Sequence, residues 1–209
     1  MAPRRAAALR GSEQSLREHL IAAAERLIAQ RGAGQLTVRE IAREAGVADG
    51  VLYNHFADKE ELLAYALQAR VQAAERAAGG PPGQAGSRTV EANLRAYLTW
   101  ALAFHAAVLP AFAGLLHQPV VLQRLAGLPQ GDGPVRAAVV DYLRAEQRLG
   151  RVAAHARVDA VAALIVGVCH DLVLRRLLHP DDATPPSLPS RDVDDLIATL
   201  LHGIAPAPE

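Results

Sequence analysis

The sequence predicts an all-α protein in which three short N-terminal helices are followed by a larger helical domain. Apolar residues make up 51% of its 209 residues but aromatic residues only 4%, so its interior consists mainly of Ala, Leu and Val. This composition favours helices, because strands are enriched in β-branched and aromatic residues. Apolar residues also recur at helical spacing along most of the chain, and no segment shows a convincing strand pattern.

The first helix is predicted over residues 15–30. Ser15 and Glu18 have the spacing of a capping box, in which two side chains satisfy free amides at the helix start. The buried face of this helix is marked by apolar residues at helical spacing: Leu16, Leu20, Ala23, Leu27 and Ile28. The glycines that follow residue 31 are expected to end it.

Residues 36–67 contain the most specific local pattern. Thr37 and Glu40 form a second capping box, so a helix is predicted to begin between them, and Gly46 follows its last apolar position. Another helix is predicted from about Asp49 to Phe56. A helix, a short glycine-containing turn and a second helix form the helix-turn-helix motif, which places its second helix in the DNA major groove.

The remainder is predicted to be helical, interrupted by stretches rich in glycine and proline. The predicted helices are 59–78, 90–109, 111–116, 120–125, 134–149, 158–178 and 192–201. The predicted connections are 79–86, 127–133 and 179–190. Pro110 is expected to kink or stop the helix before it, because proline lacks an amide hydrogen.

The helix-turn-helix segment closely resembles the DNA-binding domain of TetR-family transcriptional regulators over roughly the first third of the chain. The matching residues are Leu36-Thr37-Val38, Ile41-Ala42, Ala45-Gly46-Val47, Leu52-Tyr53, His55-Phe56 and Lys59-Glu60-Glu61-Leu62-Leu63. The resemblance implies a helix-turn-helix DNA-binding domain at 12–58, a connecting helix at 59–78, and an effector-binding and dimerisation domain at 79–209. Before them, residues 1–11 are predicted to form a disordered basic arm. Its arginines, Arg4, Arg5 and Arg10, either reach DNA or belong to a tail without that role.

The resemblance, together with the exposed positions of the motif, indicates a set of DNA-binding residues. They are Thr37, Arg39, Ala48, Asp49, Gly50, Val51, Tyr53, Asn54, His55 and Lys59. By resemblance, Thr37, Tyr53, His55 and Lys59 hold the DNA backbone, and residues 49–51 lie nearest the bases. The side chain of Asn54 has the groups to pair with an adenine edge, and Val51 suits a thymine methyl group.

Four positions leave the DNA-binding assignment open. Family members often have Ser or Thr where this chain has Ala48, so the usual helix cap is absent. Asp49 repels DNA unless it accepts a hydrogen bond from a cytosine amine. Arg39 and Arg43 either contact phosphates or belong to a solvated helix face, since acidic residues alternate with them.

Within the C-terminal domain, the resemblance implies an effector pocket and a dimer interface. The candidate pocket residues are Tyr97, Trp100, Phe104, His105, Phe112, Leu116, Tyr142 and His170. They are either the wall of a ligand site or ordinary core. The candidate interface residues are Tyr142, Ala160, Ala163, Gly167 and Leu174, whose mostly small side chains allow close helix approach.

The sequence argues against other function classes. Cys169, His170 and Asp171 are consecutive, so a helix points them in different directions and we predict no catalytic residues. No two histidines have helical metal-ligand spacing, and no metal or cofactor is expected. The single cysteine fits a reducing cytoplasm. The longest apolar run, 160–169, is half a membrane span, so no membrane partner is expected.

These observations predict a regulator that is most simply a repressor. It is expected to bind a palindromic operator in double-stranded DNA as a homodimer, and to leave it when a small, largely apolar effector binds. The alternative is a small-molecule-sensing or interaction protein on the same fold that reads DNA weakly, given Ala48 and Asp49. A more remote alternative is a hydrolytic enzyme in which His105, His117 or His170 converges with a carboxylate.

Overall fold

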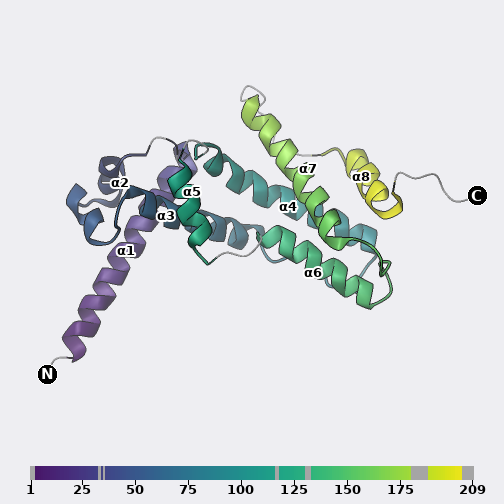
Figure 1. The fold of residues 1–209 in the computed structure, drawn as a ribbon, viewed down its shortest axis with the longest axis horizontal. Helices are drawn as coiled ribbons and strands as arrows, with labels where there is room; N and C mark the ends of the chain where they lie inside the picture. Colours follow the sequence, from purple (N-terminus) through teal and green to yellow (C-terminus); the bar gives the residue numbers. More distant parts are fainter. Residues whose placement is uncertain are drawn as a thin grey trace, which may run out of the picture. The chain divides into compact units, whose positions relative to one another are not determined.

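The computed structural model describes residues 3–32, 34, 36–115, 118–129, 133–179 and 188–203, with side chains from residue 13 onward. Every regular element in these residues is helical and none is a strand, which confirms the predicted all-α class (Figure 1). The elements are α1 (Pro3–Arg31), α2 (Val38–Ala45), the 3-10 helix η1 (Asp49–Asn54), α3 (Lys59–Ala78), α4 (Val90–Ala113), α5 (Pro119–Gly127), α6 (Pro134–Arg148), α7 (Val158–Leu178) and α8 (Ser190–His202).

The chain forms two compact units, and neither is a continuous stretch of sequence. The first comprises Met1–Ala74 and Pro110–Gln130, and the second comprises Glu75–Leu109 and Gly131–Glu209. This division differs from the predicted domains, which assigned all residues from 79 onward to the effector-binding part. Helix α3 begins in the first unit and ends in the second, whereas α4 runs the opposite way.

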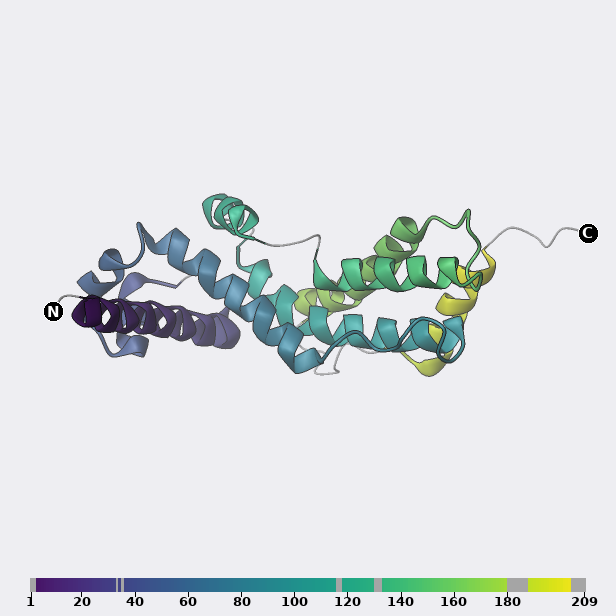
Figure 2. The same ribbon diagram turned by 90° about the horizontal axis from the view of Figure 1, so that it is seen from below.

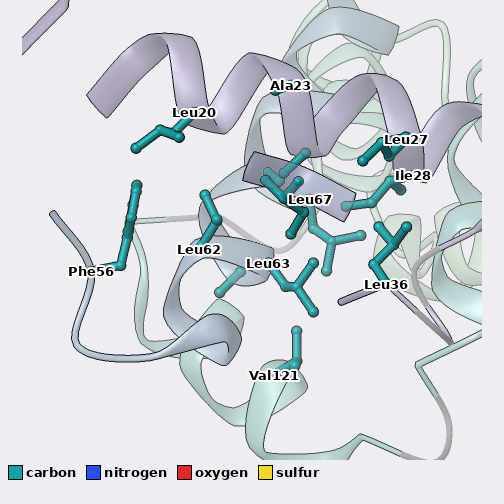
Figure 3. Packing of buried hydrophobic residues seen from close by; sticks show 14 of the residues in the cluster. Leu20, Ala23, Leu27, Ile28, Leu36, Phe56, Leu62, Leu63, Leu67 and Val121 are labelled. Carbon is teal, nitrogen blue, oxygen red and sulfur yellow. The ribbon is translucent and has the colours of Figure 1, made fainter. Parts of the chain in front are cut away.

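The core of the first unit joins the three N-terminal helices to α3 and α5. Leu20, Ala23, Leu27 and Ile28 of α1 are at most 3% exposed, as their spacing predicted. Figure 3 shows these residues above the leucines of α3, with Val121 of α5 pointing towards α3 from the opposite side. Segment 110–130 therefore supplies part of the core on which the helix-turn-helix rests.

Two helix boundaries differ from the prediction. Helix α1 begins at Pro3 rather than near Ser15, because the Ala-rich sequence before Ser15 has strong helix propensity. The predicted disordered arm is thus mostly helical, while the side chains of its arginines (Arg4, Arg5 and Arg10) lie outside the described residues. Helix α4 does not stop at Pro110 but continues to Ala113, so the piece predicted at 111–116 is its last turn.

In the second unit, α6 lies beside α4 and packs against α7 (Figures 1 and 2). Residues at helical spacing form the buried face of α7: Val158, Ala162, Ile165, Cys169 and Val173. Within the described part of the chain, α4 is the one helix long and apolar enough to pass a test for a membrane span, and 50% of the tested stretch is buried. Such burial is typical of a core helix in a helical unit.

Candidate DNA-binding surface and ligand-binding unit

The predicted capping box at the start of α2 is present. The backbone amide of Thr37 donates to Glu40 Oε2 at 2.9 Å, and the amide of Glu40 donates to Thr37 Oγ1 at 3.3 Å. The hydrogen bonds that the Thr37 hydroxyl and then the Thr37 amide donate to the carboxylate hold the pKa of Glu40 below its usual value. The Thr37 hydroxyl donates its proton to Glu40 Oε2 at 2.7 Å, so donation to a DNA phosphate would require exchange of this bond.

The turn after α2 has the predicted glycine geometry. Gly46 adopts φ 68° and ψ 31°, a left-handed conformation that glycine accommodates without strain. The amide of Val47 donates to the carbonyl of Ala42 at 2.9 Å, and that of Gly46 to the carbonyl of Arg43 at 3.2 Å. These bonds close the end of α2 and fix the direction in which the chain enters the next helix.

The second helix of the motif is shorter than predicted and is a 3-10 helix. It ends at Asn54 instead of continuing to Phe56. Ala48 precedes it without a side-chain cap, and a six-residue segment that contains Gly50 has little intrinsic helix stability.

The candidate base- and backbone-contacting residues line the outer face of this segment. Tyr53 is 60% exposed, which separates it from the aromatic cluster around buried Phe56. The other candidates are either exposed (Ala48, Asp49, Gly50 and Asn54) or half-buried (Val51 and His55). The face is therefore available to a ligand as large as DNA.

The acidic side chains of α2 face α1, whereas its basic side chains face outward. Glu44 pairs with Arg26 of α1 at 2.9 Å, and Glu40 lies 3.5 Å from Arg31 of α1. Both acids thus bind α1, leaving the exposed arginines as the charges on the outer face. Of these, Arg39 lies 3.5 Å from Asp49, with the two side chains 87% and 53% exposed. Asp49 therefore has a cationic neighbour within the protein, which reduces its repulsion of phosphates.

Two side chains of α1 that are not among the predicted site residues contact and support the helix-turn-helix motif. His19 Nε2 lies 3.0 Å from the carbonyl oxygen of Ala45, the last residue of α2. The Arg17 guanidinium lies 4.8 Å from the ring centre of Phe56 and 4.1 Å from that of Tyr65 in α3. Their partners are far away in sequence, so helical periodicity gave no signal for these contacts.

A third support comes from α5. Arg124 donates from its two terminal guanidinium nitrogens, Nη1 and Nη2, to the two carboxylate oxygens of Asp58, at 2.7 and 2.5 Å. Asp58 also accepts from the amide of Glu61 at 2.9 Å, and so caps α3. Lys59, a candidate phosphate contact, begins that helix, with its side chain 31% exposed and 3.9 Å from Glu60. This bidentate pair between Arg124 and Asp58, called the Arg124 fork below, thus holds the start of α3, where Lys59 lies.

In the second unit, the candidate pocket residues form two aromatic groups. Tyr97 lies 4.9 Å from Tyr142 and 6.1 Å from Trp100, measured between ring centres. His105 lies 5.3 Å from Phe104 and 4.7 Å from His170 of α7. Burial lowers the pKa of both histidines, which favours their neutral forms.

For three of the predicted pocket and interface residues the structure gives a different result. Phe112 belongs to the first unit, where it packs against the core, and Leu116 lies outside the described residues, as does His117. Tyr142 is 4% exposed, so it lies in the interior and not on a surface where a partner subunit would touch it.

Trp100 borders a hollow in this unit. The hollow has a volume of about 370 Å³ and is open to solvent. Its walls come from the end of α3, the loop after it, Trp100 of α4 and Pro134 of α6. The indole nitrogen donates to the carbonyl of Gly79 at 3.2 Å, which holds the ring in the wall.

A family model for bacterial regulatory proteins of the tetR family matches residues 20–66. This segment of the N-terminal unit is therefore similar to the DNA-binding domain of TetR-family regulators. The curated relatives include the transcriptional repressor KstR2 of Mycobacterium tuberculosis, 45% identical over 53 residues, which are 25% of this chain and 26% of KstR2. The regulator AcrR of Shigella flexneri is 42% identical over 50 residues, 24% of this chain and 23% of AcrR. These matches span less than a third of each relative's length.

Solved structures extend the likeness to the whole TetR-like fold. The regulator FadR of Bacillus subtilis, solved with stearoyl-CoA, superposes with a TM-score of 0.61 at 20% identity, covering 90% of this chain and 99% of that one. FadR of Bacillus halodurans gives 0.62 at 21% identity, covering 90% and 95%. At these identities the likeness establishes the fold of the second unit and not its ligand.

The similarity of residues 20–66 to TetR-family regulators points to a DNA-binding regulator and not to an enzyme. The structure also gives Cys169 no nucleophilic character, because burial raises the pKa of its thiol to about 12. Asp171 is directed to Arg175, 2.8 Å away on the same helix. Among the described residues no three His, Cys, Asp or Glu side chains gather as metal ligands.

Proposed function

We propose that this chain is a homodimeric transcriptional repressor that binds a palindromic operator and is released by a small, largely apolar effector. The observation that supports it most directly is the outer face of η1. Exposed residues that suit base edges and phosphates lie there, between the end of α2, which His19 of α1 contacts, and the start of α3, which Arg124 of α5 contacts. The curated relatives named as repressors match this chain over the same domain.

The dimer is proposed from the exposed face of α7. Leu164, Leu174 and Leu178 are 58%, 49% and 75% exposed, and Ala160, Ala163 and Gly167 are exposed beside them. A contiguous apolar face on a soluble protein commonly marks an interface, and small residues allow two helices to approach closely. Two η1 segments related by a twofold axis would meet half-sites about 34–36 Å apart.

The effector is proposed to bind the second unit near the aromatic group of Tyr97, Trp100 and Tyr142. Aromatic walls with few polar groups suit an apolar molecule, and FadR, which has the same fold, is solved with stearoyl-CoA. Two helices connect this unit covalently to the first: α3 leads from Lys59 into it, and α4 returns through Pro110 towards α5. An effector that favours one arrangement of these helices would change the population of the DNA-binding state.

The test is the affinity of the purified protein for its own upstream DNA, measured by fluorescence anisotropy across a salt series. Tyr53→Ala and Lys59→Gln should each weaken binding at least about tenfold, the effect of losing about 1.4 kcal/mol of contact. Lys59→Gln should also reduce the salt slope by about one. Arg136→Gln, which removes an exposed arginine of the second unit, is the matched control.

The alternative is a sensing protein that reads DNA weakly, because η1 lacks a side-chain cap and begins with an acid. Under this alternative the wild type would bind all sequences alike and lose its affinity as salt rises. The Tyr53 and Lys59 variants would then differ little from the Arg136 control on any DNA.

A further inference from the structure

The second unit contains a smaller cavity, distinct from the hollow beside Trp100. It has a volume of about 170 Å³ and is more enclosed. Its walls come from Leu94 of α4, Leu143 of α6, Val161 of α7 and Leu200 of α8, with the loop between α6 and α7. Its lining is apolar except for one charged side chain, Arg151 of that loop. A single cation in an apolar cavity is the arrangement that recognises an amphipathic anion.

The Arg151 guanidinium is held in place but keeps donors free. Its Nε lies 3.3 Å from Glu146 Oε2, and one terminal nitrogen donates to the carbonyl of Arg88. Its other terminal nitrogen, Nη1, has no hydrogen-bond partner in the part of the chain that the structure describes, and the side chain is 30% exposed. Because arginine has five N–H donors in a planar fork, this geometry leaves room for a carboxylate.

The surroundings of Arg151 fix its position. Glu146 is fully buried, lies beside Arg151 and accepts at Oε1 from the amide of Gly86 at 3.3 Å, while the Arg88 side chain donates to Asn93 Oδ1 at 3.1 Å. Arg88 has a φ of 45°, a strained value for a residue other than glycine, and its carbonyl is the one bound by Arg151. Strain of this kind is typical of functional sites.

We propose that this cavity binds a small apolar carboxylate with its carboxylate on Arg151 and its hydrocarbon part among Leu94, Leu143 and Val161. At roughly 30 Å³ for each water-sized group, the cavity holds about six such groups, which corresponds to a chain of about six carbons. The site is separate from the proposed effector hollow and needs no DNA, so its existence is independent of the repressor function.

The probe is hexanoate, with hexanamide as its neutral counterpart of the same length. Titration calorimetry with the full-length protein should give one hexanoate per chain, at a Kd of about a millimolar or below, as expected for so few atoms. Hexanamide should bind at least about tenfold more weakly, because hydrogen bonds to a charged group are stronger than those to a neutral one. Equal binding of the two compounds would show that Arg151 does not recognise the anion.

Two variants test separately what the Arg151 side chain and the space of the cavity contribute to hexanoate binding. Arg151→Lys keeps the charge that Glu146 needs but loses the planar fork, and should weaken hexanoate at least about tenfold. Val161→Phe fills the cavity without touching Arg151 and should abolish binding, whereas Val120→Phe, a matched change at an exposed valine of the first unit, should not. Circular dichroism confirms that each variant is folded. Hexanoate binding that survives in folded Val161→Phe, or no heat from the wild type at about 10 mM, would overturn the proposal.

Discussion

Removing the fork between Arg124 and Asp58 should destabilise the first unit and weaken operator binding. Its two hydrogen bonds measure 2.7 and 2.5 Å, and the two side chains are 35% and 38% exposed. Exposed ion pairs contribute about 0.2–1 kcal/mol, and hydrogen bonds to charged groups about 1.5–3 kcal/mol. A bidentate but partly exposed pair therefore contributes about 1–2 kcal/mol.

This free energy sets the expected effect on binding. Because about 1.4 kcal/mol is a factor of ten, loss of the fork's support for the start of α3 should weaken the operator complex about five- to thirtyfold. Asp58 also caps α3 through the amide of Glu61, so complete removal of its side chain should cost more than removal of Arg124.

A double-mutant cycle isolates the fork from the cap. Arg124→Gln removes the cation, and Asp58→Asn keeps a capping side chain while weakening the ion pair. The coupling, measured from urea unfolding, should be about 1–2 kcal/mol, with operator affinity following the same order. A coupling within about 0.3 kcal/mol, the scatter expected of independent sites, would refute the assigned role of the fork. So would an operator affinity for Arg124→Gln equal to that of Arg136→Gln.

Three further predictions concern the capping box, the support from α1 and the dimer. The lowered pKa of Glu40 stabilises the fold above the unfolded carboxyl's pKa, near 4.5, and this contribution disappears as pH falls through the lower folded pKa. Urea midpoints of the wild type and Glu40→Gln should therefore converge at acidic pH; a constant difference would contradict this. His19→Ala should lose about 1 kcal/mol in urea unfolding and weaken operator binding, because the carbonyl of Ala45 loses its partner. Leu174→Glu should yield monomers in light scattering and abolish operator binding, whereas Leu149→Glu, at a similarly exposed leucine directly after α6, should remain dimeric.

The elements predicted well are those whose signals are local. Thr37 and Glu40 are three residues apart, and the conformation at Gly46 depends on its immediate neighbours, so both were visible in the sequence. The second helix of the motif was predicted too long, because the apolar side chains of Leu52 and Phe56 suggested a continuous helical face. The backbone forms a 3-10 helix there, and no side chain caps its start.

The organisation into units was not predictable from the same signals. Val121 and Leu125 have the spacing of a buried helix face, but that spacing does not say which core receives them. Arg124 and Asp58 are 66 positions apart, and a lone arginine near a glycine break gives no hint of its partner. On α4, Tyr97 contacts Trp100 and Phe104 contacts His105, as their helical spacing indicated, whereas Phe112, beyond Pro110, was assigned to the same wall although it lies in the first unit.

Polar contacts of the flanking helices, and not apolar packing alone, determine where η1 lies. Ala, Leu and Val side chains can pack in several rotations of a short helix at similar cost, because few large shapes distinguish them. α2 and η1 together contribute few buried side chains, so burial alone determines their orientation weakly. Hydrogen bonds and ion pairs are directional, and those of His19 and Arg26 hold α2 while the Arg124 fork holds the start of α3. α5 belongs to the first unit but follows a helix that begins in the second, so the Arg124 fork joins the segment that returns from the second unit to the start of α3.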